Sequence, residues 1–232
     1  MAAITSSASA LEHRILPESP IGSLAEYERT GGGKAIQAAV AAGAEAVLGG
    51  LEASGLRGRG GAGFPTAAKW RTILSFAADP LATSVVVNAA EGEPGTYKDR
   101  LLLERNPYAV MEGAMIAAHV VGGRTITIAT KASFSQTERV RTVAAEVAGA
   151  SWNPGFEFRV VEGPHEYLYG EETALLEVIA GRPPFPRIAP PWRRGLIDVT
   201  DESTAARGTS DPSGLPAEVA LASDADDNAV PP

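Results

Sequence analysis

The sequence predicts an α/β layered domain with a mainly parallel, Rossmann-like sheet and a glycine-rich loop on its N-terminal side. Three short apolar runs, at residues 83–88, 124–130 and 156–162, are expected to form strands. A segment with helical periodicity follows each run. Strands that alternate with helices at these lengths favour parallel pairing through right-handed crossovers. Ligands bind such sheets beyond the C-terminal ends of the strands.

The N-terminal region is expected to supply helices that precede the sheet. Residues 1–26 begin rich in Ala and Ser and lack periodicity, so they are predicted to be poorly ordered. A helix is predicted over residues 34–51, where apolar residues recur at helical spacing and Gly49-Gly50 loosens the end. A short helix is predicted over residues 65–74, with proline at an early position where its missing N–H costs nothing.

Two further helices are predicted between the strands. The first follows the N-cap Asn106-Pro107 and runs to about residue 121, where a Gly-Gly pair stops it. The second is predicted to begin with a capping box formed by Ser135 and Glu138, and to end near residue 148. The predicted buried stripe of the first helix comprises Val110, Ala114, Ala117, Ala118 and Val121.

A last helix is predicted over residues 171–180, and the chain then becomes rich in proline. Residues 198–232 hold eight acidic residues, one arginine and no aromatic residue. A segment of this composition buries too little apolar surface to offset its loss of conformational entropy. We therefore predict a domain over residues 27–196 and an acidic, disordered tail over residues 197–232.

The composition excludes several classes of function. The net charge of −8 argues against a broad nucleic-acid interface. The sequence has no apolar run of about 18 residues and no secretory signal pattern, so we expect a cytoplasmic protein without direct membrane insertion. The absence of cysteine excludes disulfides, thiolate zinc sites and cysteine-bound iron–sulfur clusters in this chain. The three histidines are scattered, so no metal site is predicted.

Residues 55–70, Gly-Leu-Arg-Gly-Arg-Gly-Gly-Ala-Gly-Phe-Pro-Thr-Ala-Ala-Lys-Trp, carry the clearest signal of ligand binding. Five of the first nine are glycine, which lets peptide N–H groups approach a ligand closely. Arg57, Arg59 and Lys69 add positive charge, and a helix is expected to begin just after the loop. Backbone donors, a helix N-terminus and cations together form a phosphate site. A flexible linker is the alternative, although interleaved Arg, Phe and Trp are unusual for one.

Two other loops carry carboxylates at expected strand ends. Glu91 and Glu93 lie on a loop bent by glycine and proline, where they can accept hydrogen bonds from ribose or ribityl hydroxyls or from a carboxamide. A solvated acidic loop is the alternative. Glu171 and Glu172 lie in the first turn of a predicted helix, where a favourable interaction with the helix dipole also explains them. Residue chemistry alone therefore indicates a binder of a phosphorylated, hydroxyl-rich ligand.

Together and in this order, residues 55–70, 88–100 and 167–176 resemble the flavin- and NADH-binding domain of the 51-kDa flavoprotein subunit of respiratory complex I. Related subunits occur in NAD-reducing hydrogenases and formate dehydrogenases. The resemblance covers residues 27–196. It implies FMN and NAD as cofactors, and hydride transfer from NADH to FMN and onward to an unidentified acceptor.

The resemblance also implies roles for individual residues. The FMN phosphate is expected at the glycine loop, over Gly58, Arg59, Gly60, Gly61, Ala62 and Gly63. Lys69 is expected near the phosphates of both nucleotides, and Phe64 under the adenine of NADH. Asn88 is expected to hold the flavin, and the catalytic carboxylates are Glu91, beside the nicotinamide and flavin rings, and Glu93 close by. The opposite side of the nucleotide site is expected to be formed by Tyr167, Gly170, Glu171 and Glu172, with Glu171 near the adenine ribose.

The sequence departs from the family pattern in two places. The family has Asn-Ala-Asp-Glu where this chain has Asn88-Ala89-Ala90-Glu91, so one flavin-side carboxylate is replaced by Ala90. The acidic tail stands where the family has a Thr-Val-Asn-Asn-Val-Glu-Thr run, and the 232 residues include neither the ubiquitin-like domain nor the four-cysteine iron–sulfur domain. The expected partners are thus NADH and a cluster-bearing electron-transfer subunit. The alternatives are a non-catalytic nucleotide- or flavin-binding module and a truncated remnant of low stability.

Overall fold

A three-stranded parallel sheet in the order β1-β2-β3 lies at the centre of the computed structural model, which describes residues 15–59, 62–75, 83–132 and 134–187. The strands are β1 (Ser84–Ala89), β2 (Thr125–Lys131) and β3 (Glu157–Gly163). Val85 of β1 pairs with Ile126 of β2, which in turn pairs with Phe158 of β3. The three predicted strands and their parallel pairing are confirmed, and each strand is displaced by one residue.

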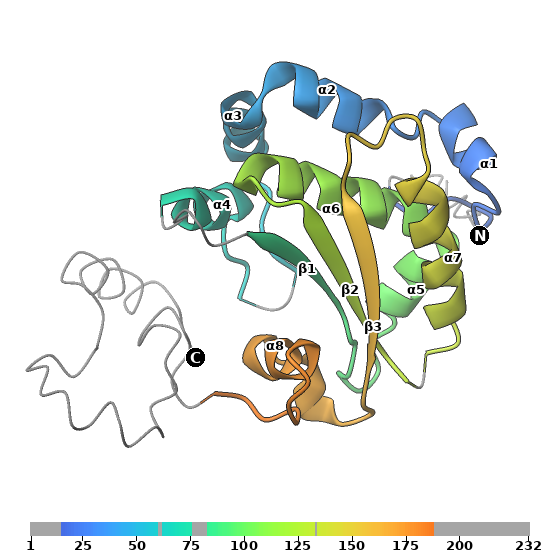
Figure 1. Cartoon of the computed structure of the whole chain (residues 1–232), viewed down its shortest axis with the longest axis vertical. Coiled ribbons are helices and arrows are strands. Elements are labelled where there is room, and N and C mark those ends of the chain that lie inside the picture. Colours follow the sequence, from blue (N-terminus) through green and yellow to red (C-terminus); the bar gives the residue numbers. More distant parts are fainter. Residues whose placement is uncertain (1–14, 60–61, 76–82, 133, 188–232) are drawn as a thin grey trace, which may run out of the picture.

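One face of the sheet carries the main core. Val85, Ile126 and Phe158 share this face, and the helices α6 (Pro107–Val121) and α7 (Thr137–Ala148) pack on it. Asn106 caps α6 by accepting a hydrogen bond from the Ala109 N–H at 3.2 Å, and Gly122 ends it at φ 72°. In Figure 1, α2 and α3 lie above α6, the sheet lies below it, and α8 lies at the lower end of the strands.

The helices that precede the sheet are α1 (Leu24–Arg29), α2 (Lys34–Ala42), α3 (Ala44–Ser54) and α4 (Thr66–Ser75). A carboxylate of α6 holds α1 and α2 against the core. Buried Glu112 accepts hydrogen bonds from the Tyr27 hydroxyl at 2.5 Å and from the N–H groups of Gly33 and Ile36, both at 2.9 Å. Since Gly33 is the N-cap of α2 and has no side chain, Glu112 takes over the capping of that helix.

Several predicted elements differ from the structure. The helix predicted over residues 34–51 is two helices, because Gly43 adopts φ 82° and ψ 162° between α2 and α3. The predicted capping box is wrong: α7 begins at Thr137, and Gln136 precedes it without a side-chain cap. The loop predicted through residue 100 already contains the helix α5 (Lys98–Arg105). On α6, the buried side differs from the predicted stripe: Val110 and Ala117 are only half-buried, while the buried side chains include Tyr108, Met111, Met115 and Val120.

The ends of the domain are partly described. Within the segment predicted to be poorly ordered, Ile21 is buried, its N–H donates to the Arg105 carbonyl at 2.9 Å, and α1 begins at Leu24. The short helix predicted over residues 65–74 is confirmed as α4. The predicted tail, residues 197–232, lies outside the described residues, so the domain limits stay predictions. Among the described residues, no helix combines the length and apolarity needed to cross a membrane.

The second face of the sheet is covered at its C-terminal end by the short 3-10 helix η1 (Tyr167–Gly170) and by α8 (Glu172–Ile179). Tyr169 and Leu175 pack there against Ala90 and Ala129. Gly163 permits this contact, because a Cβ at its position would lie 2.1 Å from the Tyr169 ring. Farther from the strand ends, this face carries exposed residues such as Arg159.

Candidate functional site

The two carboxylate-bearing loops meet at the C-terminal ends of β1 and β3, and α4, which follows the glycine loop, reaches α8 beside them. The loop after β1 contacts η1, since the Tyr167 hydroxyl donates to Glu93 Oε1 at 2.6 Å. The end of β1 also contacts the end of η1, because Asn88 Nδ2 donates to the Gly170 carbonyl at 2.8 Å. The glycine-loop side joins them through Lys69 Nζ, which lies 3.6 Å from Glu172 Oε1. Ligand sites in parallel sheets lie at the C-terminal ends of the strands, and this rule correctly predicted that the loops after β1 and β3 lie together.

The glycine loop has a hydrogen-bonded base. Gly58 N–H donates to the Phe64 carbonyl at 2.8 Å, and Thr66 N–H donates to the Leu56 carbonyl at 3.0 Å. The Arg57 guanidinium donates to the Gly63 carbonyl at 3.1 Å, and Gly63 adopts φ 65°, which glycine tolerates. Such a base distinguishes the loop from a flexible linker. Gly58, Arg59 and Ala62 are exposed, Phe64 is half-buried, and Gly60 and Gly61 lie outside the described residues.

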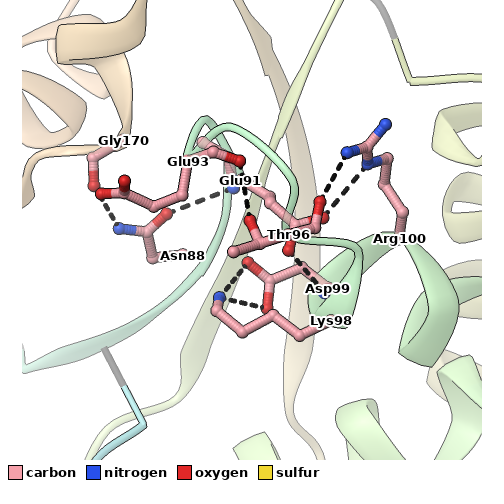
Figure 2. A network of polar contacts seen from close by, with 9 residues as sticks. Asn88, Glu91, Glu93, Thr96, Lys98, Asp99, Arg100 and Gly170 are labelled. Atoms are coloured by element: carbon pink, nitrogen blue, oxygen red, sulfur yellow. Dashed lines mark hydrogen bonds and ion pairs between the residues drawn. The ribbon is translucent and has the colours of Figure 1, made fainter. Parts of the chain in front are cut away.

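Glu91 is a buried anchor of the loop after β1. Its side chain is 1% exposed, and it accepts hydrogen bonds from Arg100 Nε at 3.1 Å and from the Asp99 N–H at 3.3 Å. Burial acts to raise the pKa of this carboxyl, but the hydrogen bonds from Arg100 and from the backbone of α5 outweigh burial, so the pKa lies below its usual value. Figure 2 shows the Glu91 carboxylate directed toward Arg100, on the side away from Asn88 and Gly170.

Glu93, on the same loop, and Asn88, near the end of β1, are both exposed. Glu93 is exposed, and its carboxylate holds the Tyr167 hydroxyl; this hydrogen bond raises the pKa of Tyr167. The Asn88 amide both donates and accepts, because its Oδ1 also accepts a hydrogen bond from the Ala90 N–H at 3.2 Å. The paired acids of the sequence therefore have separate surroundings: Glu91 is buried in an ion pair, and Glu93 faces solvent.

Glu171 is the N-cap of α8. Its Oε2 accepts from the Ala174 N–H at 2.9 Å and from the Thr173 hydroxyl at 2.5 Å. Burial acts to raise its pKa, and these hydrogen bonds outweigh it and lower the pKa. The sequence left open a structural role for Glu171 at the start of this helix. That role is present: Glu171 is the N-cap, one position before the first turn. Glu172 opens the helix and faces Lys69.

Three residues near this edge were missed by the sequence reasoning. Arg100 pairs with Glu91, nine positions earlier. Both residues lie in the segment 88–100, so a basic residue this near a carboxylate could have suggested the ion pair. Lys131 ends β2 and is buried, at 4% exposure, although a terminal lysine usually indicates an exposed strand end. Phe185 is 68% exposed on the proline-rich segment after α8, where a free aromatic ring is available to stack on a planar ligand.

The segment that carries Phe185 is held against α8 by Glu177. Arg182 and Arg187 both donate to the Glu177 carboxylate, and the Arg187 N–H donates to the Thr173 hydroxyl at 3.0 Å. The segment therefore returns along α8 toward Glu171. The hydrogen bond from Arg182 is the largest of the effects that lower the pKa of Glu177 to about 2.

This pKa predicts a pH-dependent stabilisation. Because the folded-state pKa lies below the ordinary value of about 4.3, the contribution of Glu177 is complete above that value and is lost as the pH falls toward 2. Glu177→Gln should therefore lower the free energy of unfolding at neutral pH, and the difference from wild type should vanish toward pH 2. Urea unfolding of both proteins across this range measures the difference; a gap that does not change with pH contradicts the assignment.

Comparison with known proteins identifies the family. Residues 51–207, more than half of the chain, match the model of the complex I 51-kDa family, described as the Nuo51 FMN-binding domain. The chain belongs to this family. Similar members include an NADH-quinone oxidoreductase subunit of Aquifex aeolicus, 32% identical over 189 residues that cover 76% of this chain and 43% of the relative. The mitochondrial 51 kDa subunit of NADH-ubiquinone oxidoreductase of Neurospora crassa is 37% identical over 158 residues, which cover 63% and 32%.

A solved structure extends this family likeness to the fold. An NAD+-reducing NiFe hydrogenase in the H2-reduced state matches with a TM-score of 0.63 and 35% identity, over 74% of this chain and 30% of the hydrogenase chain. The predicted Rossmann-like α/β fold and the predicted family are both confirmed. This chain spans less than half the length of these relatives. Among its described residues, no group of three or more His, Asp and Glu side chains could hold a metal ion.

Proposed function

We propose that this chain is the nucleotide-binding part of an NADH-oxidising flavoprotein, and that it binds FMN and NADH at the C-terminal edge of the sheet. The observation that carries the proposal is the meeting of the three family segments at that edge, through the contacts Glu93–Tyr167, Asn88–Gly170 and Lys69–Glu172. Because the chain spans under half of its relatives, their complete activities do not transfer without a test.

The residues present fit a phosphorylated flavin. The glycine loop exposes Gly58, Arg59 and Ala62, and the cations Arg59 and Lys69 suit a phosphate. Gly170 lets η1 pack closely on the sheet edge, because a Cβ there would lie 3.0 Å from the Ala90 carbonyl oxygen. Bound FMN supplies a ring that accepts a hydride from NADH.

The chain's own residues bind and orient the two nucleotides in this proposal. The ion pair of Glu91 with Arg100 fixes the path of the loop after β1, although Glu91 was predicted to face the reacting rings. Glu93 orients Tyr167 at the open side of the site. Lys69, at 57% side-chain exposure and only loosely paired with Glu172, is free to turn toward a phosphate.

Titration of the purified chain with FMN tests the proposal. Quenching of flavin fluorescence should give a stoichiometric complex, and anaerobic NADH should bleach the flavin absorbance. Failure to bind FMN, or preference for FAD, contradicts the proposal. Binding of FMN without bleaching favours the alternative of a non-catalytic binding module, which the buried Ala90 at the place of the family's aspartate supports.

Electron transfer beyond the flavin is predicted to require another molecule. The chain contains no cysteine, so it has no cysteine-bound cluster of its own, and we propose that a cluster-bearing subunit accepts the electrons in the assembly. The purified, flavin-loaded chain should contain no iron and should reduce soluble dyes with NADH. Iron and sulfide analysis beside a dye-reduction assay measures both; stoichiometric iron in a homogeneous sample refutes the prediction. Cytoplasmic localisation remains a prediction.

A further inference from the structure

Lys131 is a buried lysine at the edge of the sheet where the site is formed. It is the last residue of the central strand β2, pairs in register with Gly163 of β3, and is 4% exposed. Lysine is rarely buried to this extent unless a carboxylate neutralises it, because removing an ammonium from water is unfavourable. Its burial at this place therefore requires an explanation.

The Lys131 ammonium lies against Gly92, the residue between Glu91 and Glu93 in the loop after β1. A Cβ at Gly92 would lie 2.7 Å from Nζ and 3.3 Å from the Tyr167 ring. Glycine at position 92 thus lets the loop close over the ammonium. Two strand ends and η1 meet around this one charged group.

No hydrogen bond or ion pair joins Lys131 Nζ to any other residue in the part of the chain that the structure describes. Glu91 is engaged by Arg100, and Glu93 by Tyr167. Burial lowers the pKa of Lys131, and the charge of the Glu166 carboxylate partly opposes this shift.

A second buried donor lies close by. The Tyr169 ring covers Gly163, the residue paired with Lys131, and the Tyr169 hydroxyl is buried without a hydrogen-bond partner among the described residues. Burial raises the pKa of Tyr169 to about 12, so the hydroxyl keeps its proton at neutral pH. The Tyr169 hydroxyl and the ammonium of the mostly buried Lys131 thus provide two donors for an electron-rich group at this edge.

We infer that Lys131 tunes the bound flavin: its ammonium, against Gly92, supplies the positive charge that favours the reduced, electron-rich ring over the oxidised ring. This inference rests on the proposed function. Addition of two electrons increases negative charge on the ring, and a nearby cation in a partly dry site stabilises that charge more than the same cation in water. Lys131 therefore raises the reduction potential of bound FMN.

The test compares Lys131→Met with wild type in the full, FMN-loaded chain. Methionine keeps the length and apolar stem of the side chain and removes the charge. We expect reduced FMN to be disfavoured about tenfold relative to oxidised FMN, which corresponds to a midpoint potential lower by about 30 mV for a two-electron couple. Lys131→Arg should restore the wild-type potential. Equilibration with reference dyes under anaerobic conditions gives the potential, and flavin fluorescence gives the Kd of oxidised FMN.

Lys98→Met is the matched control, because Lys98 lies on the neighbouring helix, is 48% exposed and pairs with Asp99. Its potential should equal that of wild type. Urea unfolding of the apo proteins checks that Lys131→Met folds, which is expected because removal of an unpaired buried charge does not destabilise a fold. An unchanged potential in a Lys131→Met protein that binds FMN overturns the inference and leaves the proposed function intact. Absence of FMN binding by wild type overturns both.

Discussion

Replacing Glu171 by glutamine should largely remove the preference of this chain for NADH over NADPH. In the proposed site, the Glu171 carboxylate accepts a hydrogen bond from the adenine-ribose 2′-hydroxyl and repels a 2′-phosphate. Repulsion between two charges about 4 Å apart in a partly screened site is of the order of a few kcal/mol, as an upper bound. At roughly 1.4 kcal/mol per decade, the wild-type preference is then about ten- to a hundredfold. Binding titrations with both nucleotides measure the ratio.

The structure makes Glu171 an N-cap as well, so the experiment needs to separate capping from specificity. Glu171→Gln removes the charge but keeps a side-chain oxygen that can accept from Ala174 N–H, whereas Glu171→Ala removes both. Glu171→Ala should therefore lose about 1 kcal/mol of stability in addition to its altered nucleotide ratio. If Glu171 only caps α8, both variants keep the wild-type ratio. Glu157→Gln is the control for a change in net charge, because Glu157 lies at the start of β3, away from the site.

Replacing Arg100 by methionine should destabilise the protein by about 2 kcal/mol at neutral pH. The substitution leaves the Glu91 carboxylate buried without its cation. The expected loss lies below the range for fully buried pairs because the Arg100 side chain is 36% exposed. Chemical denaturation gives the free energy of unfolding, and Lys98→Met on the same helix is the control for charge removal.

The pH dependence of this loss has a definite sign. In wild type, the folded-state pKa of Glu91 is depressed, so its contribution is present above the ordinary pKa and is lost as the pH falls through the folded value. In Arg100→Met, burial without a cation raises the pKa of Glu91, which becomes protonated on acidification. The deficit should therefore be largest at neutral pH and should shrink toward pH 4 and below. In the Glu91→Gln background, Arg100→Met should have little effect; an equal loss in both backgrounds rules out the ion pair as the cause.

The sequence was sufficient to predict the strands and the meeting of the loops after β1 and β3. β-branched apolar runs gave the strands, and the parallel pairing then brought residues as distant as Glu93 and Tyr167 into contact. The break at Gly43 was missed because the apolar spacing continues across it. Ser135 has the correct spacing for a cap, but spacing alone does not determine where α7 begins.

The surroundings of each site residue could not be obtained from the sequence. The two acids of the loop after β1 are only two positions apart, yet one is buried against α5 and the other is exposed. That difference depends on Arg100, in a helix the sequence reasoning did not predict. Lys131 was missed for a similar reason: its burial depends on the closure of a loop almost 40 positions earlier, which no local pattern records.

The Glu112 cap of α2 makes the N-terminal helices and the sheet a single cooperative unit. The amide protons of Gly33 and Ile36 are bound by a carboxylate that belongs to α6, far along the chain. They can exchange with solvent only when α2 separates from α6, and that separation breaks the buried hydrogen bonds that Glu112 accepts. Their exchange should therefore be as slow as that of the central strand β2. On this basis α2 neither frays independently of α6 nor folds before α6 has formed.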